Sequence, residues 1–504
     1  MKYKLIAAVC LVGVTAVTVL GFSSLLDEEK APRYHQHMER RGYTACTDHG
    51  EETFCTHLPL IEIDTGDEEI PGKPSGAQDI FNEDTYTTTE DGEDMIRASV
   101  SVYDSESGNN HLTDTPTMSI SSKIRVRGYS SRTFEKAPYL LKFVNDDGTD
   151  LDLPILGMDA HHEWVLHGPY LDKSLVRNYM WYNISGEIMD YAPNVRFCEL
   201  VVNGDYRGIY LLVESIDNGD DCRLNLSVTE KGQTLTGYLL RLDRPMEEDL
   251  DTLRNIYSFT ERTNILANDV SIRYPGKDKL TKEIADAIEK DFARYEKAMY
   301  SYDYDSKKYG YRSYIDVDSF VDYYIINEFT KNLDAGKYST YIYLQPGEKY
   351  KLCVWDFNNA CNNYVTNDIN TTGIKDIDGI TGFSMHVKVF FVMLMRDKDF
   401  VDAVIDRYEE LRTTYLSDDY LAKYIQDTVD YLGPAIDRNS ERWMDYIVSD
   451  QLQPAERNVH SQKEVVEKLA DWLRDRGQWL DNNINSLYQY CADSKNKKYN
   501  EEPN

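Results

Sequence analysis

The stretch from residue 331 to 363 constrains the fold more than any other part of this chain. It reads KNLDAGKYSTYIYL, then a short turn, then KYKLCVWDFNNACNN. Asp334 follows a helical pattern, and a second acid, Asp356, comes after an alternating pattern typical of paired strands. We therefore expect a β-ribbon over residues 340–355 with an acidic loop at each end.

The order of these residues is the order in which protein kinases build their catalytic and metal-binding loops. Asp334 would meet the substrate hydroxyl, Ser339 lies five positions on where a metal ligand can stand, and Asp356 would hold Mg²⁺. Taken alone, Asp334 is also typical of a turn aspartate, and Asp356 of a buried salt bridge. The three together favour phosphoryl transfer.

Length and charge narrow the class of protein. The chain has 504 residues, enough for a large core and two lobes. Its formal net charge is −32, from 87 acids and 55 bases, which argues against nucleic-acid binding because phosphate contacts need clustered Lys and Arg.

The N-terminus resembles a targeting signal. Lys2 and Lys4 precede an uncharged run over residues 5–26, long enough to cross a bilayer as a helix. We expect residues 1–26 to be a signal anchor, or else a signal peptide, with the rest of the chain outside the cytoplasm. The protein would then be anchored at the cell surface or secreted, and would meet the membrane only through this segment.

Three further boundaries follow from composition and periodicity. Residues 27–92 are polar and acid-rich and read as a linker or stalk. Strand-like alternation dominates about 93–275, and helical periodicity dominates about 276–490, which includes a helix capped by Asp316 or Asp318. We expect an α+β fold with a strand-rich N-lobe, a helix-rich C-lobe and a tail over 491–504.

Cysteines outside the first segment offer two candidate disulfides. Cys46 with Cys55 is the most favourable local pair, and Cys353 with Cys361 would brace the Asp356 loop. No cysteine spacing in the sequence resembles a tetrahedral zinc site.

Two segments could bind the phosphates of a nucleotide. Lys142 lies on the strand pattern YLLKF, although a solvated strand lysine would look the same. The loop RGYSSR, from Arg127 to Arg132, provides backbone N–H groups, hydroxyls and cations, as a simple hairpin turn also would.

Histidines raise a metal-hydrolase alternative. His161, His162 and His167 lie close in sequence, but adjacent His-His is a poor ligand spacing and no His-Glu-x-x-His helix exists. Hydrolase chemistry is the weaker interpretation.

An ordered set of blocks resembles the CotH family, the spore-coat protein H kinases. The blocks are RVRGYSSR with KAPYLLKF, HGPYLDKSLVRNYMWYNIS, VVNGDYRGIYLLVESID, KNLDAGKYSTYIYL, VWDFNNACNN and the closing LADWLRDRGQWLDNNI. The resemblance covers about residues 93–490.

The resemblance implies a two-lobed atypical protein-kinase fold. It also implies an enzyme that uses ATP and Mg²⁺ (or Mn²⁺) to phosphorylate Ser or Thr of a surface or coat protein. The roles that it implies fall on Asp334 as catalytic residue; on Asp356, Ser339 and Asn358 at the metal; and on Lys142 (with Lys136 as a less favoured claimant), Arg127, Ser130, Ser131 and Glu214 at the nucleotide.

Two departures from the family pattern bear on activity. Tyr129 replaces an Asn in the RGNSS motif, and Asn358 replaces the last acid of WDFD, which removes one negative metal ligand. A catalytically weak surface scaffold or adhesion protein on a kinase-like fold is therefore the alternative function. Transfer of another nucleotide-derived group, such as AMP, is a third.

Overall fold

The computed structural model describes residues 33–46, 54–75, 86–105, 108–219, 224–227, 229–230, 232, 234–244, 269–364, 379–453 and 455–497. The chain divides into two units, Met1–Tyr34 and His35–Asn504, and every helix and strand named below belongs to the second. The expected signal anchor over residues 1–26 lies outside the described residues. Among the residues that are described, no helix has both the length and the apolar character needed to cross a membrane.

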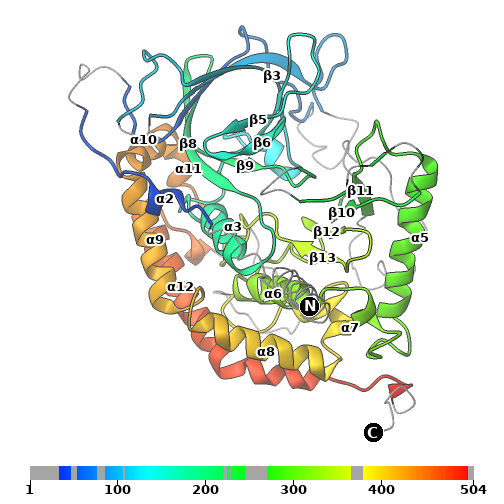
Figure 1. The fold of residues 1–504 in the computed structure, drawn as a ribbon. Coiled ribbons are helices and arrows are strands. Elements are labelled where there is room, and N and C mark those ends of the chain that lie inside the picture. Colours follow the sequence, from blue (N-terminus) through cyan, green and yellow to red (C-terminus); the bar gives the residue numbers. More distant parts are fainter. Residues whose placement is uncertain are drawn as a thin grey trace, which may run out of the picture. The chain divides into compact units, whose positions relative to one another are not determined.

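A closed seven-stranded barrel forms the first part of the fold (Figure 1). Its strands run in the order β1-β2-β3-β4-β7-β9-β8, and β8 closes on β1 in parallel. The alternation of β4 sorts its side chains, because Leu141 and Phe143 enter the barrel core while Leu140 and Lys142 face outward. The barrel strands are β1 (Leu60–Asp64), β2 (Ile96–Tyr103), β3 (Met118–Val126), β4 (Tyr139–Phe143), β7 (Glu163–His167), β8 (Val195–Val202) and β9 (Asp205–Glu214).

Strand β1 shows that part of the expected linker belongs to the folded domain. Residues 27–92 were predicted to be a stalk, yet Leu60–Asp64 pairs with both β2 and β8 and completes the barrel. Ile61 and Ile63 point into the barrel core, fully buried. The acidic composition around this short strand concealed it, so the folded domain begins well before residue 93.

A second sheet joins residues that the predicted lobe boundary near 275 had separated. Its order is β11-β10-β12-β13, so two strands from before that boundary share a sheet with two from after it, joined by the pairing of β10 with β12. The predicted ribbon over 340–355 is confirmed as β12 and β13. The strands are β10 (Tyr238–Asp243), β11 (Asp269–Tyr274), β12 (Thr340–Leu344) and β13 (Lys351–Cys353), and a separate ribbon is formed by β5 (Leu153–Ile155) and β6 (Met158–His161).

Helices α3 (Arg177–Ile188) and α6 (Val317–Phe329) lie at the centre of the main core, and nearly every residue of each is buried. A helix that is buried on all sides shows little amphipathic patterning, unlike the surface helices around it. The side chain of Asp316 caps α6, as one of the two predicted alternatives required. The position of α6 fixes the start of the Asp334 loop, which follows its last turn.

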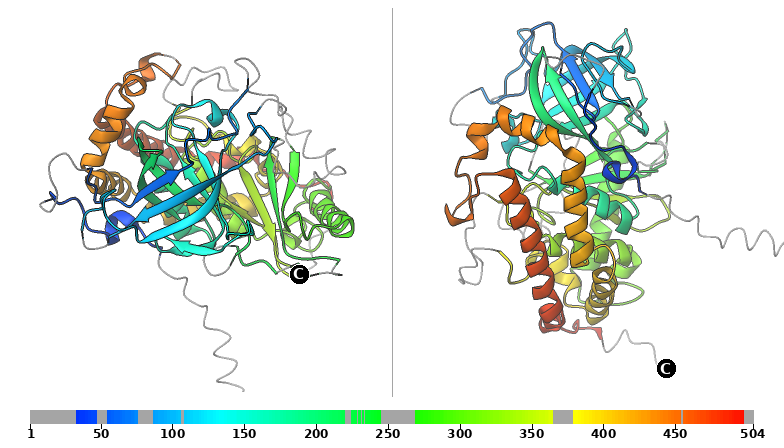
Figure 2. Two further views of the ribbon diagram at one scale, coloured as in Figure 1. Left: turned by 90° about the horizontal axis from the view of Figure 1, so that it is seen from above. Right: turned by 90° about the vertical axis from the view of Figure 1, so that its left-hand side faces the viewer.

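The predicted helix-rich region is confirmed, with breaks that local chemistry explains (Figure 2). Gly433 adopts φ +47° and Pro434 follows, so α9 ends there and α10 begins. Asp397 caps α8 after a short interruption. The remaining helices are α2 (Gln36–Glu39), α5 (Lys282–Met299), α7 (Phe391–Leu394), α8 (Lys398–Arg412), α9 (Asp418–Leu432), α10 (Pro434–Arg442), α11 (Met444–Ile447) and α12 (Gln462–Asn483), with 3-10 turns η2 (Ser130–Thr133), η4 (Tyr311–Ser313), η5 (Met385–Val387), η6 (Ala455–Arg457) and η7 (Ile484–Tyr490).

Candidate active site

Helix α3 holds the loop that carries Asp356. The backbone N–H of Asp356 donates to the hydroxyl of Tyr182 at 3.0 Å, and that of Phe357 donates to Asn178 Oδ1 at 2.6 Å. The ring of Phe357 also packs against Tyr182 and Trp181. These contacts come from successive turns of one buried helix, so the loop is fixed by the rigid core.

The Asp334 loop is joined to the Asp356 loop by side-chain amides. Asn332 Nδ2 donates to the backbone oxygen of Asp356 at 2.9 Å, and Asn359 Nδ2 donates to Asp334 Oδ2 at 2.9 Å. The two acidic loops therefore lie next to each other in the structure.

Three carboxylates interact electrostatically at this junction. Burial raises the pKa of Asp356 to about 6; the charges of Asp334 and Asp243 add to that rise, while the N–H of Asn358 and the charge of Arg127 oppose it. Like charges brought together in this way favour a divalent cation, whose binding relieves their repulsion.

Asp243 was missed by the sequence analysis. It lies at the end of β10, and its Oδ2 accepts the backbone N–H of Ser339 at 3.1 Å. Burial raises the pKa of this carboxyl group as well. The sequence RLDR offered no spacing signal, because the strand pairing of β10 with β12 is what brings Asp243 to the site.

Two residues of the site hold strained backbone conformations. Ser339 has φ +49° and Asp356 has φ +60°, both in the left-handed region that disfavours residues other than glycine. Such a conformation costs of order 1–3 kcal/mol and is concentrated at functional sites. The predicted position of Ser339 beside the carboxylates is present, through its backbone contact with Asp243.

Asn358, a predicted metal ligand, is engaged elsewhere. Its Oδ1 lies 3.0 Å from His167 Nε2 and 3.2 Å from Asn178 Nδ2. Burial lowers the pKa of His167 to about 4, so the imidazole is neutral near pH 7. This geometry favours a role for Asn358 in holding the loop over a role as metal ligand.

A cavity of about 620 Å³ lies between the outer face of the barrel and the second sheet. In a chain with net charge −32, its lining is locally basic, with five cations against two acids. Trp355, which directly precedes Asp356, is one of its lining residues. The charged lining residues are Arg125, Arg127, Lys142, Arg273, Lys277, Asp94 and Glu163, and the apolar ones are Met95, Leu140, Val165, Ile216, Leu280, Tyr341 and Trp355.

Lys142 and Arg127, which were predicted to bind nucleotide, both line this cavity. Lys142 Nζ lies 3.3 Å from Glu163 Oε2, its cross-strand neighbour on β7. The guanidinium of Arg127 stacks 5.8 Å from the centre of the Trp355 ring and is close enough to lower the pKa of Asp356. Arg127 therefore places a cation near the Asp356 carboxylate.

The loop after β3 reaches the Asp334 loop through a stacked arginine. The Arg244 guanidinium lies 5.0 Å from the ring centre of Tyr129 and 3.7 Å from that of Tyr338. Ser130 and Ser131 belong to the same loop but do not line the cavity. Gly128 is required here, because a Cβ at its φ of +98° would lie 2.1 Å from Ser131 Oγ.

Two predicted candidates lie away from the cavity. The buried carboxylate of Glu214 accepts the backbone N–H of Asn194 at 2.8 Å and its side-chain amide at 3.1 Å, and Ser215 and Ile216 line the cavity instead. Lys136 is buried against Asn439, to which its Nζ donates at 2.7 Å. Both side chains are committed to structural hydrogen bonds.

The sequence analysis also missed Lys388, a cation near Asp334. Lys388 Nζ donates to the backbone oxygen of Leu333 at 2.6 Å. Burial, with a smaller contribution from Lys337, lowers the pKa of Lys388 to about 8, and Asp334 opposes that shift. Gly336 allows this approach, since a Cβ there would lie 2.9 Å from the Cβ of Lys388.

The metal-hydrolase alternative is not supported by the structure, although two of its histidines do lie in a cluster of potential metal ligands. Asp152, His161 and His162 place one ligand atom each within 4.8 Å of the others. The Nδ1 of His161, however, accepts the N–H of Glu163 at 2.9 Å, so it serves the turn before β7.

Neither expected disulfide is present. Cys46 is not bonded to Cys55, nor Cys353 to Cys361, and Cys353 and Cys361 are buried in the core. The Asp356 loop is braced by the hydrogen bonds of α3 rather than by a covalent bridge.

The mixed α+β fold carries a cavity with a cationic lining beside clustered carboxylates. Together they define a candidate phosphoryl-transfer site. The family model described as CotH kinase protein matches residues 124–480, and the chain belongs to this family. No curated protein matches the chain. Membership of a kinase family indicates the use of ATP and a divalent metal, and the donor set of the site fits both.

Proposed function

We propose that this protein is a Ser/Thr protein kinase that transfers the γ-phosphate of ATP to a surface or coat protein outside the cytoplasm. The observation that carries the proposal is the basic cavity, lined in part by Trp355 directly before Asp356, in a strongly acidic chain. A cavity with this charge in such a protein favours a polyanionic ligand.

The cavity lining offers both apolar and cationic side chains, as the two ends of ATP require. Leu140, Val165 and Trp355 offer apolar surface for a base. Lys142 and Arg127 offer cations for phosphates, and Glu163 holds Lys142 in place. In this arrangement the barrel is the N-lobe and the helical part is the C-lobe of a two-lobed kinase.

The carboxylates then take separate roles. Asp356, with Asp243 nearby, would hold Mg²⁺ or Mn²⁺, which neutralises phosphate charge when bound. Asp334 would orient the acceptor hydroxyl and take its proton as the hydroxyl oxygen bonds to the γ-phosphorus and the bond to the leaving ADP oxygen breaks. Asn359, which donates to Asp334 Oδ2, fixes the carboxylate for this role.

The proposed location depends on the N-terminal segment. Residues 1–26 would anchor the protein or direct its export, and its partner would be a protein with Ser or Thr acceptors. The test is a topology experiment, in which a protease added to intact cells should cleave a tag after residue 504 and spare one before residue 1. Protection of the C-terminal tag would contradict the proposed location.

The activity test uses the full chain in detergent with labelled ATP, Mg²⁺ or Mn²⁺ and Ser- and Thr-containing proteins. We expect label on a protein hydroxyl, lost in Asp356→Asn and Asp334→Asn and retained in Asp146→Asn, which alters an exposed loop. Mass spectrometry of the product separates phosphoryl from adenylyl transfer. Absence of label with either metal would overturn the kinase proposal.

One observation favours the alternative function as a surface scaffold. Asn358 stands where the family has an acid, and its oxygen is held by His167 and Asn178. If Asn358→Asp raises phosphoryl transfer from an undetectable level, the native protein is a weak enzyme and the scaffold function gains support.

A further inference from the structure

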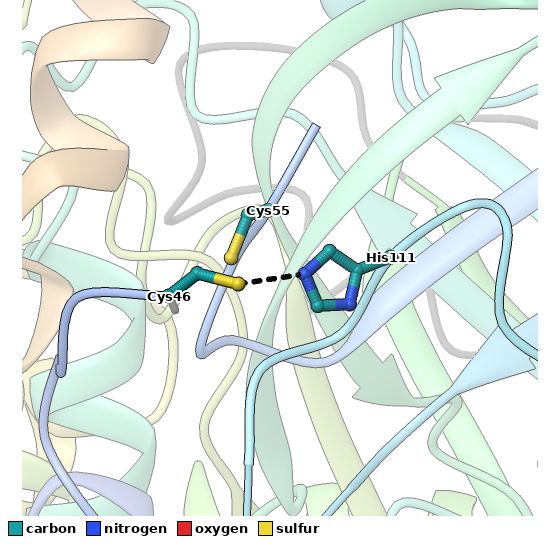
Figure 3. A group of neighbouring side chains, drawn as sticks. All are labelled: Cys46, Cys55 and His111. Atoms are coloured by element: carbon teal, nitrogen blue, oxygen red, sulfur yellow. Dashed lines mark hydrogen bonds between the residues drawn. The ribbon is translucent and has the colours of Figure 1, made fainter. Parts of the chain in front are cut away.

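A second group of metal-ligating side chains lies outside the cavity (Figure 3). It consists of Cys46, Cys55 and His111, and one ligand atom from each lies within 4.8 Å of the other two. Cys46 Sγ is 3.3 Å from His111 Nε2. Two sulfurs and a nitrogen held by tetrahedral Zn²⁺ would be about 3.5 Å apart, from ordinary Zn–S and Zn–N bond lengths, so the observed spacing is close to that of a metal site.

The imidazole is oriented by a carboxylate behind it. His111 is buried, and its Nδ1 lies 3.0 Å from Asp114 Oδ2, which also accepts the backbone N–H of His111 at 2.9 Å. This contact places the ring proton on Nδ1 and directs the lone pair of Nε2 toward Cys46. A carboxylate in this position accompanies most zinc-binding histidines and raises their basicity.

The backbone holds the three ligands together without help from a metal. Thr56, beside Cys55, and Asn110, beside His111, exchange two backbone hydrogen bonds of 3.1 and 2.6 Å. Asn109 Nδ2 donates to the backbone oxygen of Thr44, two residues before Cys46, at 3.1 Å. The site is therefore preorganised, which reduces the entropy lost when a ligand binds.

The donor set selects the class of cation. Thiolates and imidazole prefer Zn²⁺ and similar thiophilic ions, whereas Mg²⁺ requires oxygen ligands. We propose that Cys46, Cys55 and His111 form a zinc site that fastens the segment before β1 to the connection between β2 and β3. On binding, both thiols release their protons to solvent, as does Nε2 of any protonated His111, and water completes the tetrahedron.

A zinc ion here would reinforce contacts that already tie the same segments. Arg40 Nη2 donates to Asp104 Oδ2 at 2.9 Å, from the segment after α2 to the end of β2. Because β1 closes the barrel and Cys55 lies five residues before it, the zinc site would stabilise the closing strand.

The experiment measures metal content and stability rather than activity. The full chain, purified in detergent with a thiol reductant, is analysed for zinc and titrated with Co²⁺, which reports thiolate ligands by a charge-transfer band. We expect one zinc per chain and a thiolate–Co²⁺ band, both lost in Cys55→Ser and His111→Gln and retained in Cys491→Ser, whose thiol lies outside the group.

A positioning variant separates the zinc site from a merely structural histidine. Asp114→Asn should weaken zinc affinity by about 10- to 100-fold while the Co²⁺ band keeps its shape at saturation. The melting temperature of the native protein should fall when a chelator removes zinc. A Cys46–Cys55 disulfide that persists in the purified protein, or a wild-type titration without a thiolate–Co²⁺ band, would overturn the proposal.

Discussion

The two candidate metal sites differ in donor chemistry and in how the chain assembles them. Asp334, Asp356 and Asp243 offer hard oxygen donors, held by α3 and by the second sheet. Cys46, Cys55 and His111 offer soft donors, held by backbone pairs between loops. The comparison teaches how ligand type alone would separate two cations in one fold, because the proposed assignments put Mg²⁺ or Mn²⁺ at the first site and Zn²⁺ at the second.

The largest expected effect comes from removing a carboxylate from the site formed by Asp334, Asp356 and Asp243. Asp356→Asn should lower the rate of phosphoryl transfer by on the order of 10³-fold or more, because it removes charge stabilisation from the metal while keeping the shape of the side chain. Zinc content should not change. Steady-state kinetics with labelled ATP and metal analysis of the same sample provide both readouts, and a loss of less than about 10-fold would contradict the assigned role.

Lys142→Ala sharpens the comparison by removing a cation and sparing both sets of metal ligands. We expect nucleotide affinity to fall by about 10- to 100-fold, since an ammonium group pairs with phosphate charge in the cavity. Isothermal titration with a non-hydrolysable ATP analogue measures it. The matched control is Lys123→Ala, which changes the neighbouring lysine on β3 outside the cavity lining and should bind like the wild type.

The raised pKa of Asp356 predicts that the difference in stability between the wild type and Asp356→Asn depends on pH. A carboxyl group whose pKa rises from 3.8 to about 6 on folding costs stability as pH increases through this range, because the folded state resists ionisation. Without metal at pH 7.5, Asp356→Asn should therefore be more stable than the wild type by about 1–3 kcal/mol. The difference should vanish near pH 4 in urea titrations, and a destabilised variant at pH 7.5 would refute the assignment.

The smallest expected effect concerns the stacked arginine. Arg244→Ala removes the contacts with Tyr129 and Tyr338, and a cation–π contact is worth about 0.5–1 kcal/mol. We expect kcat/KM to fall by about 2- to 5-fold. Arg244→Lys should recover part of this loss, whereas equal losses in both variants would argue against a stacking role.

The sequence predicted the parts of the site that lie on one continuous pattern. The acids Asp334 and Asp356 flank a ribbon whose alternation is visible in the letters, and Lys142 faces outward by the same rule. Asp243 and Lys388 escaped notice because strand pairing and helix packing bring them to the site from distant positions. For the same reason, nothing in the sequence indicated that His111 lies beside Cys46 and Cys55.

The barrel shows the corresponding limit for the fold. Its hairpins could be predicted from alternation, but β1 is five residues long within an acid-rich stretch, and only its pairing with β2 and β8 reveals it. The lobe boundary failed for a related reason, since β10, which also carries β11, pairs forward with β12 across it. Non-local pairing leaves no trace in a window of sequence.

Manganese binding observed by electron paramagnetic resonance tests the central claim most directly, namely that Asp334 and Asp356 face one divalent cation beside a nucleotide. With ATP present, the wild type should bind a single Mn²⁺, Asp356→Asn should bind it at least about 10-fold more weakly, and Asp334→Asn should alter the spectrum of the bound ion. Mn²⁺ binding that is identical in the wild type and both variants would contradict the account.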